Sequence, residues 1–127
     1  MRYLSAAQIV AIHEQVILPN ELQGMAQNKS IDAVVARLEN RLAYGLMGDV
    51  FDLAACYLCY VAVGYCFHDA NKRTAHTAMQ LVLRLNGVTV RFDVEEMGGK
   101  VISAAQGKLE DEDIAQYLRS SVVSLEE

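Results

Sequence analysis

The sequence has little positive charge and no basic tract: 11 lysine and arginine residues against 16 aspartate and glutamate residues give a net charge of −5. Non-specific binding to DNA or to an anionic membrane needs a cationic surface, which this balance does not favour. The longest uncharged stretch, residues 53–68, has an apolar core at 53–63 that is too short to cross a bilayer. We therefore expect neither direct nucleic-acid binding nor membrane insertion.

Cysteine is also scarce, with three residues in the chain. The N-terminus lacks the apolar stretch of a signal peptide, so we expect a cytoplasmic protein with reduced thiols. Cys56 and Cys59 form a C-x-x-C pair, and Cys66 and His68 follow, so a zinc site is conceivable. The first pair lies inside an apolar helical pattern, however, and the second lacks zinc-finger spacing. The favoured interpretation is that the thiols pack in the core.

Internal repeats and low-complexity linkers are absent, and 127 residues with 53% apolar content fit one domain with a genuine core, residues 1–127. The single proline, Pro19, lies in the stretch 18–29, which also carries Asn20, Gly24 and Asn28 and is therefore predicted to be a loop. An irregular segment of this length in a small domain is often functional.

Apolar residues recur at helical spacing through most of the chain. The segment at 51–64 is apolar on all sides, which predicts a buried central helix. Residues 88–92 alternate weakly but are too short and isolated to predict a sheet. The predicted class is all-α, a single compact six-helix domain around that central helix. Helices are expected at about 6–17, 31–44, 51–64, 70–85 and 94–105, with a last one opening at the acidic run 110–113.

Several side chains can be assigned from these patterns. His13 falls one residue past the apolar stripe of its helix, so we expect it at the surface or half-buried. Tyr57 should pack in the core with its hydroxyl at the edge, and Arg41 should face water. Gly98 and Gly99 weaken their predicted helix, and close backbone packing would explain them.

Polar residues concentrate where the apolar run ends and an amphipathic helix begins. Asp69 or Ala70 lies near the cap, and Asn71, Lys72 and Arg73 follow. Helix N-termini bind anions through free N–H groups and the positive dipole end. Cations in a first turn oppose that dipole, which favours a bound anion there, and a carboxylate supplies an oxygen ligand for Mg²⁺. The pattern indicates a polyphosphate and magnesium site; the alternative is a capped helix with a solvated basic turn.

The stretch 67–75 resembles the signature of the Fic/Doc family, in the version carried by death-on-curing toxins. That signature has His, any residue, Phe, any residue, Asp, Ala, Asn, Lys, Arg and Thr. Phe67 and residues 69–74 match in order and spacing, whereas Tyr65 stands at the position of the histidine. The resemblance extends over nearly the whole chain.

The resemblance implies that ATP and Mg²⁺ bind at this loop, with Asp69 as the metal ligand and Ala70 in the nucleotide site. Asn71 would orient the loop and the phosphates, and Lys72 and Arg73 would contact phosphate oxygens. Family members with glycine at the Lys72 position generally transfer the nucleotide, whereas those with lysine transfer the terminal phosphate. A second arginine of the AMP-transferring members is replaced by His76 in this chain.

The implied function is that of a toxin in a toxin–antitoxin module, a protein kinase that inactivates elongation factor Tu and arrests translation. The implied partner is an antitoxin of the prevents-host-death type, whose C-terminal helix would enter an apolar groove near residues 6–17 and 18–29. The sequence contains no inhibitory-helix motif of the kind that some Fic-type proteins carry.

Tyr65 alters the expected activity. The family histidine takes the proton of the incoming hydroxyl, whereas a tyrosine keeps its own proton at neutral pH and is a poor base. We expect this chain to be strongly impaired, with His68 as a weaker candidate for the base. Two alternatives stay open: a non-catalytic module that binds nucleotide or a partner, and an AMP-transferase.

Overall fold

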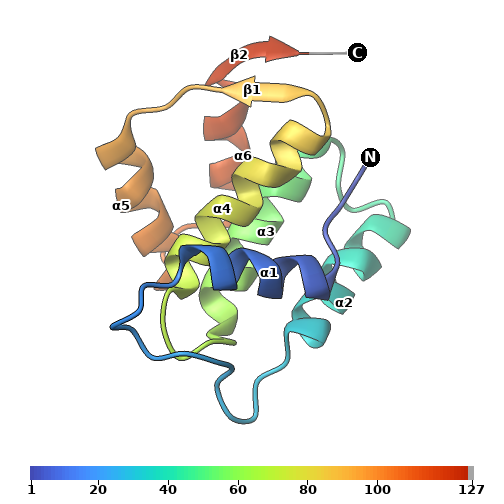
Figure 1. Ribbon diagram of the computed structural model, residues 1–127. Helices are drawn as coiled ribbons and strands as arrows, with labels where there is room; N and C mark the ends of the chain where they lie inside the picture. The colour runs from blue at the N-terminus through green and yellow to red at the C-terminus, as the bar shows by residue number, and fades with distance from the viewer. Residues whose placement is uncertain (126–127) are drawn as a thin grey trace.

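Six α-helices and one two-stranded sheet make up the computed structural model, which describes residues 1–125 (Figure 1). The all-α class and the number of helices are as predicted. The elements are α1 (Ala6–Val16), α2 (Ile31–Ala43), α3 (Val50–Gly64), α4 (Asn71–Leu85), β1 (Val88–Val90), α5 (Val94–Ala105), α6 (Asp111–Arg119) and β2 (Val122–Leu125).

Helix α3 lies at the centre and contacts α2, α4, α5 and α6 (Figure 1). Residues 53–59 are all buried, which confirms the central position expected for an all-apolar helix. The hydroxyl of Tyr57 is buried as well, so the prediction that it would lie at the edge was wrong. It accepts the Leu4 N–H at 2.8 Å and donates to the Leu4 carbonyl at 2.7 Å, and the N-terminal segment thus satisfies it.

Four of the helices, α1, α2, α3 and α5, begin at side-chain caps that the sequence indicates. Ser5 and Gln8 form a reciprocal capping box at α1, and Ser30 caps α2. Asp49 caps α3, and Asp93 caps α5. Each cap accepts a backbone N–H that has no partner within the helix, which fixes where the helix starts.

Strand β1 pairs antiparallel with β2, with Val88 opposite Leu125. The prediction that residues 88–92 would form no sheet was therefore wrong. The partner strand lies more than 30 residues later in the chain, so no local pattern announces the pairing. The sheet runs across one end of the helices, beside the C-terminal end of α4 (Figure 1).

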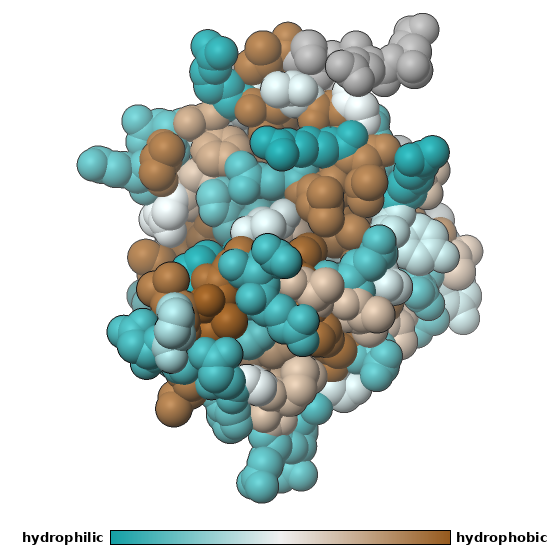
Figure 2. Space-filling model, in the orientation of Figure 1, coloured by the Kyte–Doolittle hydropathy of each residue, from teal (hydrophilic) through white to brown (hydrophobic). Residues whose placement is uncertain are grey.

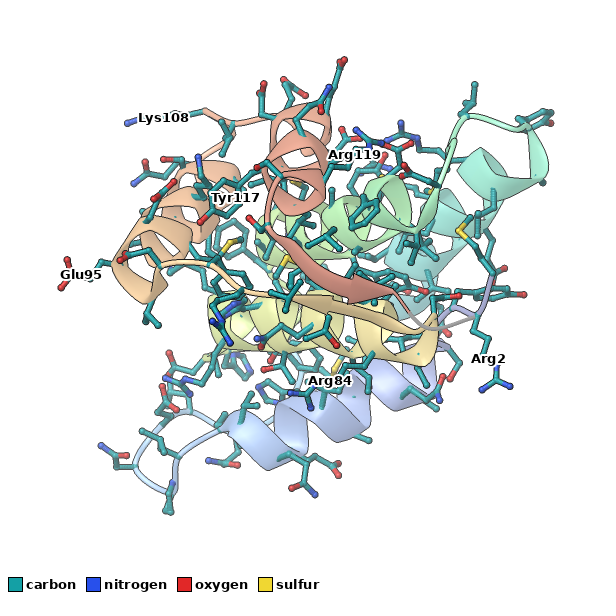
Figure 3. All side chains as sticks on the ribbon, turned by 90° about the horizontal axis from the view of Figure 1, so that it is seen from above. Arg2, Arg84, Glu95, Lys108, Tyr117 and Arg119 are labelled. Carbon is teal, nitrogen blue, oxygen red and sulfur yellow. The ribbon has the colours of Figure 1, made fainter. Side chains whose placement is uncertain are left out.

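Ion pairs tie the helices together on the side of α6. Arg119 of α6 points towards the start of α3 (Figure 3), where it bonds Asp49 at 2.9 Å and Asp52 at 2.7 Å. Arg41 of α2 bonds the hydroxyl of Tyr60 at 2.7 Å and the carboxylate of Asp111 at 3.1 Å. Arg41 thus links three helices instead of facing water, contrary to the expectation from the helical pattern.

Three further results concern the two glycines of α5, the surface and the length of the helices. An added Cβ at Gly98 or Gly99 would meet nothing within 4 Å, so close packing does not explain these glycines. The face shown in Figure 2 carries small hydrophobic patches between hydrophilic side chains. Within residues 1–125, each helix is too short or too polar to cross a bilayer.

Candidate functional site

Two residues with left-handed backbone enclose the loop between α3 and α4. Tyr65 is the C-cap of α3 with φ 47°, and Ala70 is the N-cap of α4 with φ 64°. Such a conformation costs a residue with a side chain of the order of 1 kcal/mol or more. It persists where surrounding contacts fix the backbone.

Asn71 supplies part of this fixation, because its amide side chain bonds both backbone groups of Phe67. Its Oδ1 accepts the Phe67 N–H at 3.1 Å, and its Nδ2 donates to the Phe67 carbonyl at 2.8 Å. Phe67 itself is buried, with 3% of its surface exposed. These bonds hold the loop backbone in place, and the role implied for Asn71 in orienting the loop and the phosphates stays a prediction.

The predicted loop at 18–29 lies directly against the motif loop. The Ala26 N–H donates to the Cys66 carbonyl at 2.8 Å, and the His68 N–H donates to the Gly24 carbonyl at 3.2 Å. These bonds form a single antiparallel bridge between Met25 and Phe67. The two loops are therefore held as one unit.

His13 of α1 is buried beneath this unit, with 4% of its surface exposed, so its expected surface or half-buried position was wrong. Its ring stacks on Phe67 with centroids 3.8 Å apart and planes 6° apart. Its Nε2 lies 2.9 Å from the backbone carbonyl of Asp69. The motif loop folds back over α1 and covers a position that the helical pattern alone places near water.

The charged residues of the motif are partly engaged by the 18–29 loop. Arg73 bonds Glu21 at 2.8 and 3.3 Å and the Val16 carbonyl at 2.8 Å. The hydrogen bond from Arg73 holds the pKa of Glu21 below its ordinary value. The Asp69 carboxylate accepts the N–H of Leu22 at 3.0 Å. Sequence reasoning missed Glu21, and its only local signal was a carboxylate in a loop suspected of function.

The start of α4 remains open to an anion. Ala70 makes no side-chain cap, so the N–H groups of residues 71–73 have no acceptor within the helix. Lys72 is exposed and makes no ion pair with the residues that the structure describes. Free N–H groups beside an exposed cation form a site suited to phosphate oxygens.

The donor set also fits Mg²⁺, under one condition. No group of three His, Cys, Asp or Glu side chains in residues 1–125 could hold a metal ion alone. Mg²⁺ commonly binds through one or two carboxylates, with phosphate oxygens and waters completing the shell. Asp69 suits that arrangement, so the residues fit an ion bound together with phosphates.

Tyr65 and His76 stand at the positions where the resemblance leads one to look for a general base and for a second cation. The Tyr65 hydroxyl donates to the Ala105 carbonyl at 3.1 Å, at the end of α5. The Nε2 of His76 is buried without a partner, and burial lowers the pKa of this histidine. His76 therefore does not supply the second cation that an arginine would at its position.

A cavity of about 290 Å³ opens between α1 and the 18–29 loop. Val10, Ile17 and Met25 give it apolar walls, and His13 and Phe67 of the motif loop line it as well. A shallower groove of about 200 Å³ lies between α4 and α5, next to Lys72. Lys72 and Arg73, the candidates for binding phosphate, thus lie between the cavity beside α1 and the groove between α4 and α5.

This arrangement of loop, helix N-terminus and central helix belongs to a defined class. The chain is a member of the Fic/DOC family, whose sequence model matches residues 3–83 and so covers α1, α2, α3 and most of α4. It is similar to the "Protein kinase doc" of Escherichia phage P1, with 38% identity over 120 residues that cover 94% of each chain. These matches confirm the resemblance drawn from residues 67–75.

Proposed function

We propose that this protein is a toxin of a toxin–antitoxin module, built to transfer the terminal phosphate of ATP to elongation factor Tu in the cytoplasm and so to arrest translation. The observation that carries the proposal is the uncapped start of α4, with Lys72 exposed beside free N–H groups and Asp69 adjacent. The kinase name of the similar phage protein supports phosphate transfer, as does lysine at position 72.

The residues divide the work of phosphate transfer. This reaction depends mainly on positioning and on neutralising the phosphates. Lys72 would act as a point charge, and the N–H groups of residues 71–73 would bond phosphate oxygens. Arg73 would exchange Glu21 for a phosphate oxygen, and Asp69 would hold Mg²⁺. The bound Mg²⁺ would neutralise the charge that develops on the phosphates.

Tyr65 makes the chain, as it stands, weakly active or inactive. Its hydroxyl proton is donated to the Ala105 carbonyl, so the oxygen is not placed to remove a proton from an incoming hydroxyl. A positioned general base contributes about 10²–10⁴-fold to a rate. We expect this factor to be missing, while binding of nucleotide remains. His68 is exposed and lies next to Asp69, but its side chain makes no hydrogen bond with residues 1–125 that would orient it as a replacement base.

The same observation favours a second candidate function, a non-catalytic module that binds nucleotide or a partner. In that case the Tyr65 bond to α5 would be a structural link between the motif and the last part of the fold. AMP transfer is the third possibility, but His76 is neutral at the position where AMP-transferring members carry an arginine.

The antitoxin partner would be of the prevents-host-death type, and its C-terminal helix would need an apolar surface. The cavity beside α1 offers Val10, Ile17 and Met25, and Leu18 and Leu22 are exposed on the adjoining loop at 50% and 66%. The cavity supports a groove beside residues 6–17 and 18–29, and that location stays a prediction. Binding of a synthetic antitoxin tail, and its loss on Ile17→Asp, would test the assignment.

The experiment that tests the function compares the chain with Tyr65→His. Each is incubated with elongation factor Tu and with ATP labelled at either the γ- or the α-phosphate. We expect transfer of γ-label by Tyr65→His and little by the parent chain. Transfer of α-label would indicate an AMP-transferase, and nucleotide binding without transfer in both proteins would indicate the binding module. Growth arrest on induction of Tyr65→His, relieved by the antitoxin, would establish the toxin role.

A further inference from the structure

The contact that needs an explanation is the one between His13 and the backbone of Asp69. A buried side chain at this point of α1 could be purely apolar, since it stacks on Phe67 and lines the same cavity as Val10 and Ile17. Burying a polar ring without a hydrogen bond is unfavourable. The His13 ring has one, to the Asp69 carbonyl at 2.9 Å, and because a carbonyl can only accept, Nε2 carries the proton.

That carbonyl lies at the critical point of the loop. Asp69 immediately precedes Ala70, which adopts the left-handed conformation and leaves α4 without a side-chain cap. On the other side of Ala70, its carbonyl accepts both the N–H and the hydroxyl of Thr74, at 2.9 and 2.7 Å. The strained residue is therefore fixed from both sides, by His13 before it and by Thr74 after it.

We propose that His13 is a positioning residue for the metal ion: its Nε2–H fixes the Asp69 carbonyl and so aims the Asp69 carboxylate at the Mg²⁺ that accompanies the nucleotide. This inference rests on the proposed function. The carbonyl carbon of Asp69 is bonded to the Cα that carries the carboxylate side chain, so a hydrogen bond that holds the carbonyl in place also holds that Cα, and a shift of the loop backbone would carry the carboxylate with it. Within residues 1–125, the carboxylate itself is bonded by the Leu22 N–H, from a loop on which Leu22 is exposed.

Two variants separate the hydrogen bond from the packing. His13→Phe keeps an aromatic ring against Phe67 and loses the donor, whereas His13→Gln keeps an N–H donor and loses the stacked ring. A positioning role predicts that phenylalanine is the damaging change. A packing role predicts the reverse order. His68→Phe is the matched control, because His68 is exposed and directly precedes Asp69 in the chain.

The readout is the magnesium dependence of nucleotide binding, which needs no turnover and suits a chain with Tyr65. The dissociation constant of ATP is measured by calorimetry with excess Mg²⁺ and with EDTA. The value in EDTA divided by the value in Mg²⁺ gives the gain in affinity that Mg²⁺ provides, and this ratio is compared between variants. Loss of an outer partner of a metal ligand typically weakens metal binding about 10–100-fold. We expect His13→Phe to reduce the ratio about tenfold, at the lower end of that range, while the affinity in EDTA, set by Lys72 and the helix N-terminus, changes little.

Each outcome decides a different claim. If the parent chain binds ATP no better with Mg²⁺ than with EDTA, the proposed function is overturned and the positioning role with it. If the parent shows the magnesium effect and His13→Phe retains it, the positioning role alone is overturned. If His13→Gln loses the effect and His13→Phe keeps it, His13 acts by packing. Thermal unfolding of each variant confirms the fold, and His13→Gln decides the question should His13→Phe not fold.

Discussion

Asn71 provides the sharpest prediction about what holds the motif loop. Replacing it with alanine removes both bonds to the Phe67 backbone, at 3.1 and 2.8 Å. The bridge to Met25 is closed by Cys66 and His68, so it leaves the N–H and carbonyl of Phe67 to Asn71. Asn71 therefore takes the place of a neighbouring strand, and Asn71→Ala would leave two backbone groups of a buried residue unpaired.

The expected magnitude follows from that count. A buried polar group that loses its partner costs about 1–3 kcal/mol, so two such groups cost about 2–6 kcal/mol. Alanine is the better helix former by roughly 0.5 kcal/mol, which offsets part of the loss. We expect Asn71→Ala to lower the free energy of unfolding by about 1.5–5.5 kcal/mol. Domains of this size are stable by about 5–15 kcal/mol, so a loss in the lower or middle part of that range leaves the variant folded.

The assay is equilibrium unfolding in urea, followed by circular dichroism, with Asn86→Ala as the matched control. Asn86 makes the same pair of bonds to the backbone of Arg2, each at 2.8 Å, but at an exposed site; its Nδ2 also donates to the Val82 carbonyl at 2.8 Å, within its own helix end. Water can replace those bonds, so the control should lose less than about 1 kcal/mol. Equal losses in the two variants would refute the reasoning, because burial of the Phe67 backbone would then make no difference. Faster hydrogen exchange of the Phe67 amide in Asn71→Ala would locate the effect.

Three other predictions follow from contacts of the same kind. Glu21→Gln should strengthen ATP binding a few-fold by calorimetry, because Arg73 no longer has to leave a carboxylate to bind phosphate. The pKa of Glu21 is lowered, so its carboxylate is charged throughout the neutral range and the gain in affinity should be the same at pH 6 and pH 8. An unchanged affinity would mean that Arg73 does not contact the phosphates. Arg41→Met should cost about 1–3 kcal/mol of stability in urea, because it breaks charged hydrogen bonds to Tyr60 and Asp111. Neither partner belongs to the motif, so ATP affinity should not change, and a change in affinity would contradict this separation. Burial raises the pKa of both Cys56 and Cys59 to about 12, so a thiol reagent at pH 8 should label them only after unfolding; rapid labelling of the folded chain would disprove their burial.

The features that sequence analysis could predict are those written within a few residues of one another. Helix starts follow from caps such as Ser30 and Asp49, whose side chains bond an N–H three residues later. The motif cluster is local in the same sense, since Asp69 and Arg73 are separated by about one helical turn. For these features, the distance along the chain is close to the distance in space.

The features that could not be predicted depend on contacts between distant segments. His13 meets Asp69 across 56 positions, and Glu21 meets Arg73 across 52. Periodicity places a side chain on a face of its own helix and contains no information on what later covers that face. The sheet was missed for the same reason, because β1 finds its partner at the end of the described chain. Loop length alone indicated that residues 18–29 were involved.

The contacts of that loop fall into two groups with different consequences. Backbone bonds from residues 24 and 26 fasten the loop to the motif beside the buried Phe67, and a nucleotide need not disturb them. The contacts of Glu21 and Leu22 instead engage Arg73 and Asp69, the groups proposed to meet phosphate and metal. If the site works as proposed, ligand binding would replace the second group, and the first would act as the anchor about which residues 18–22 move. Changes at the anchor should act mainly on stability, and changes at residues 21 and 22 mainly on affinity, because only the latter contacts differ between the free and the bound protein.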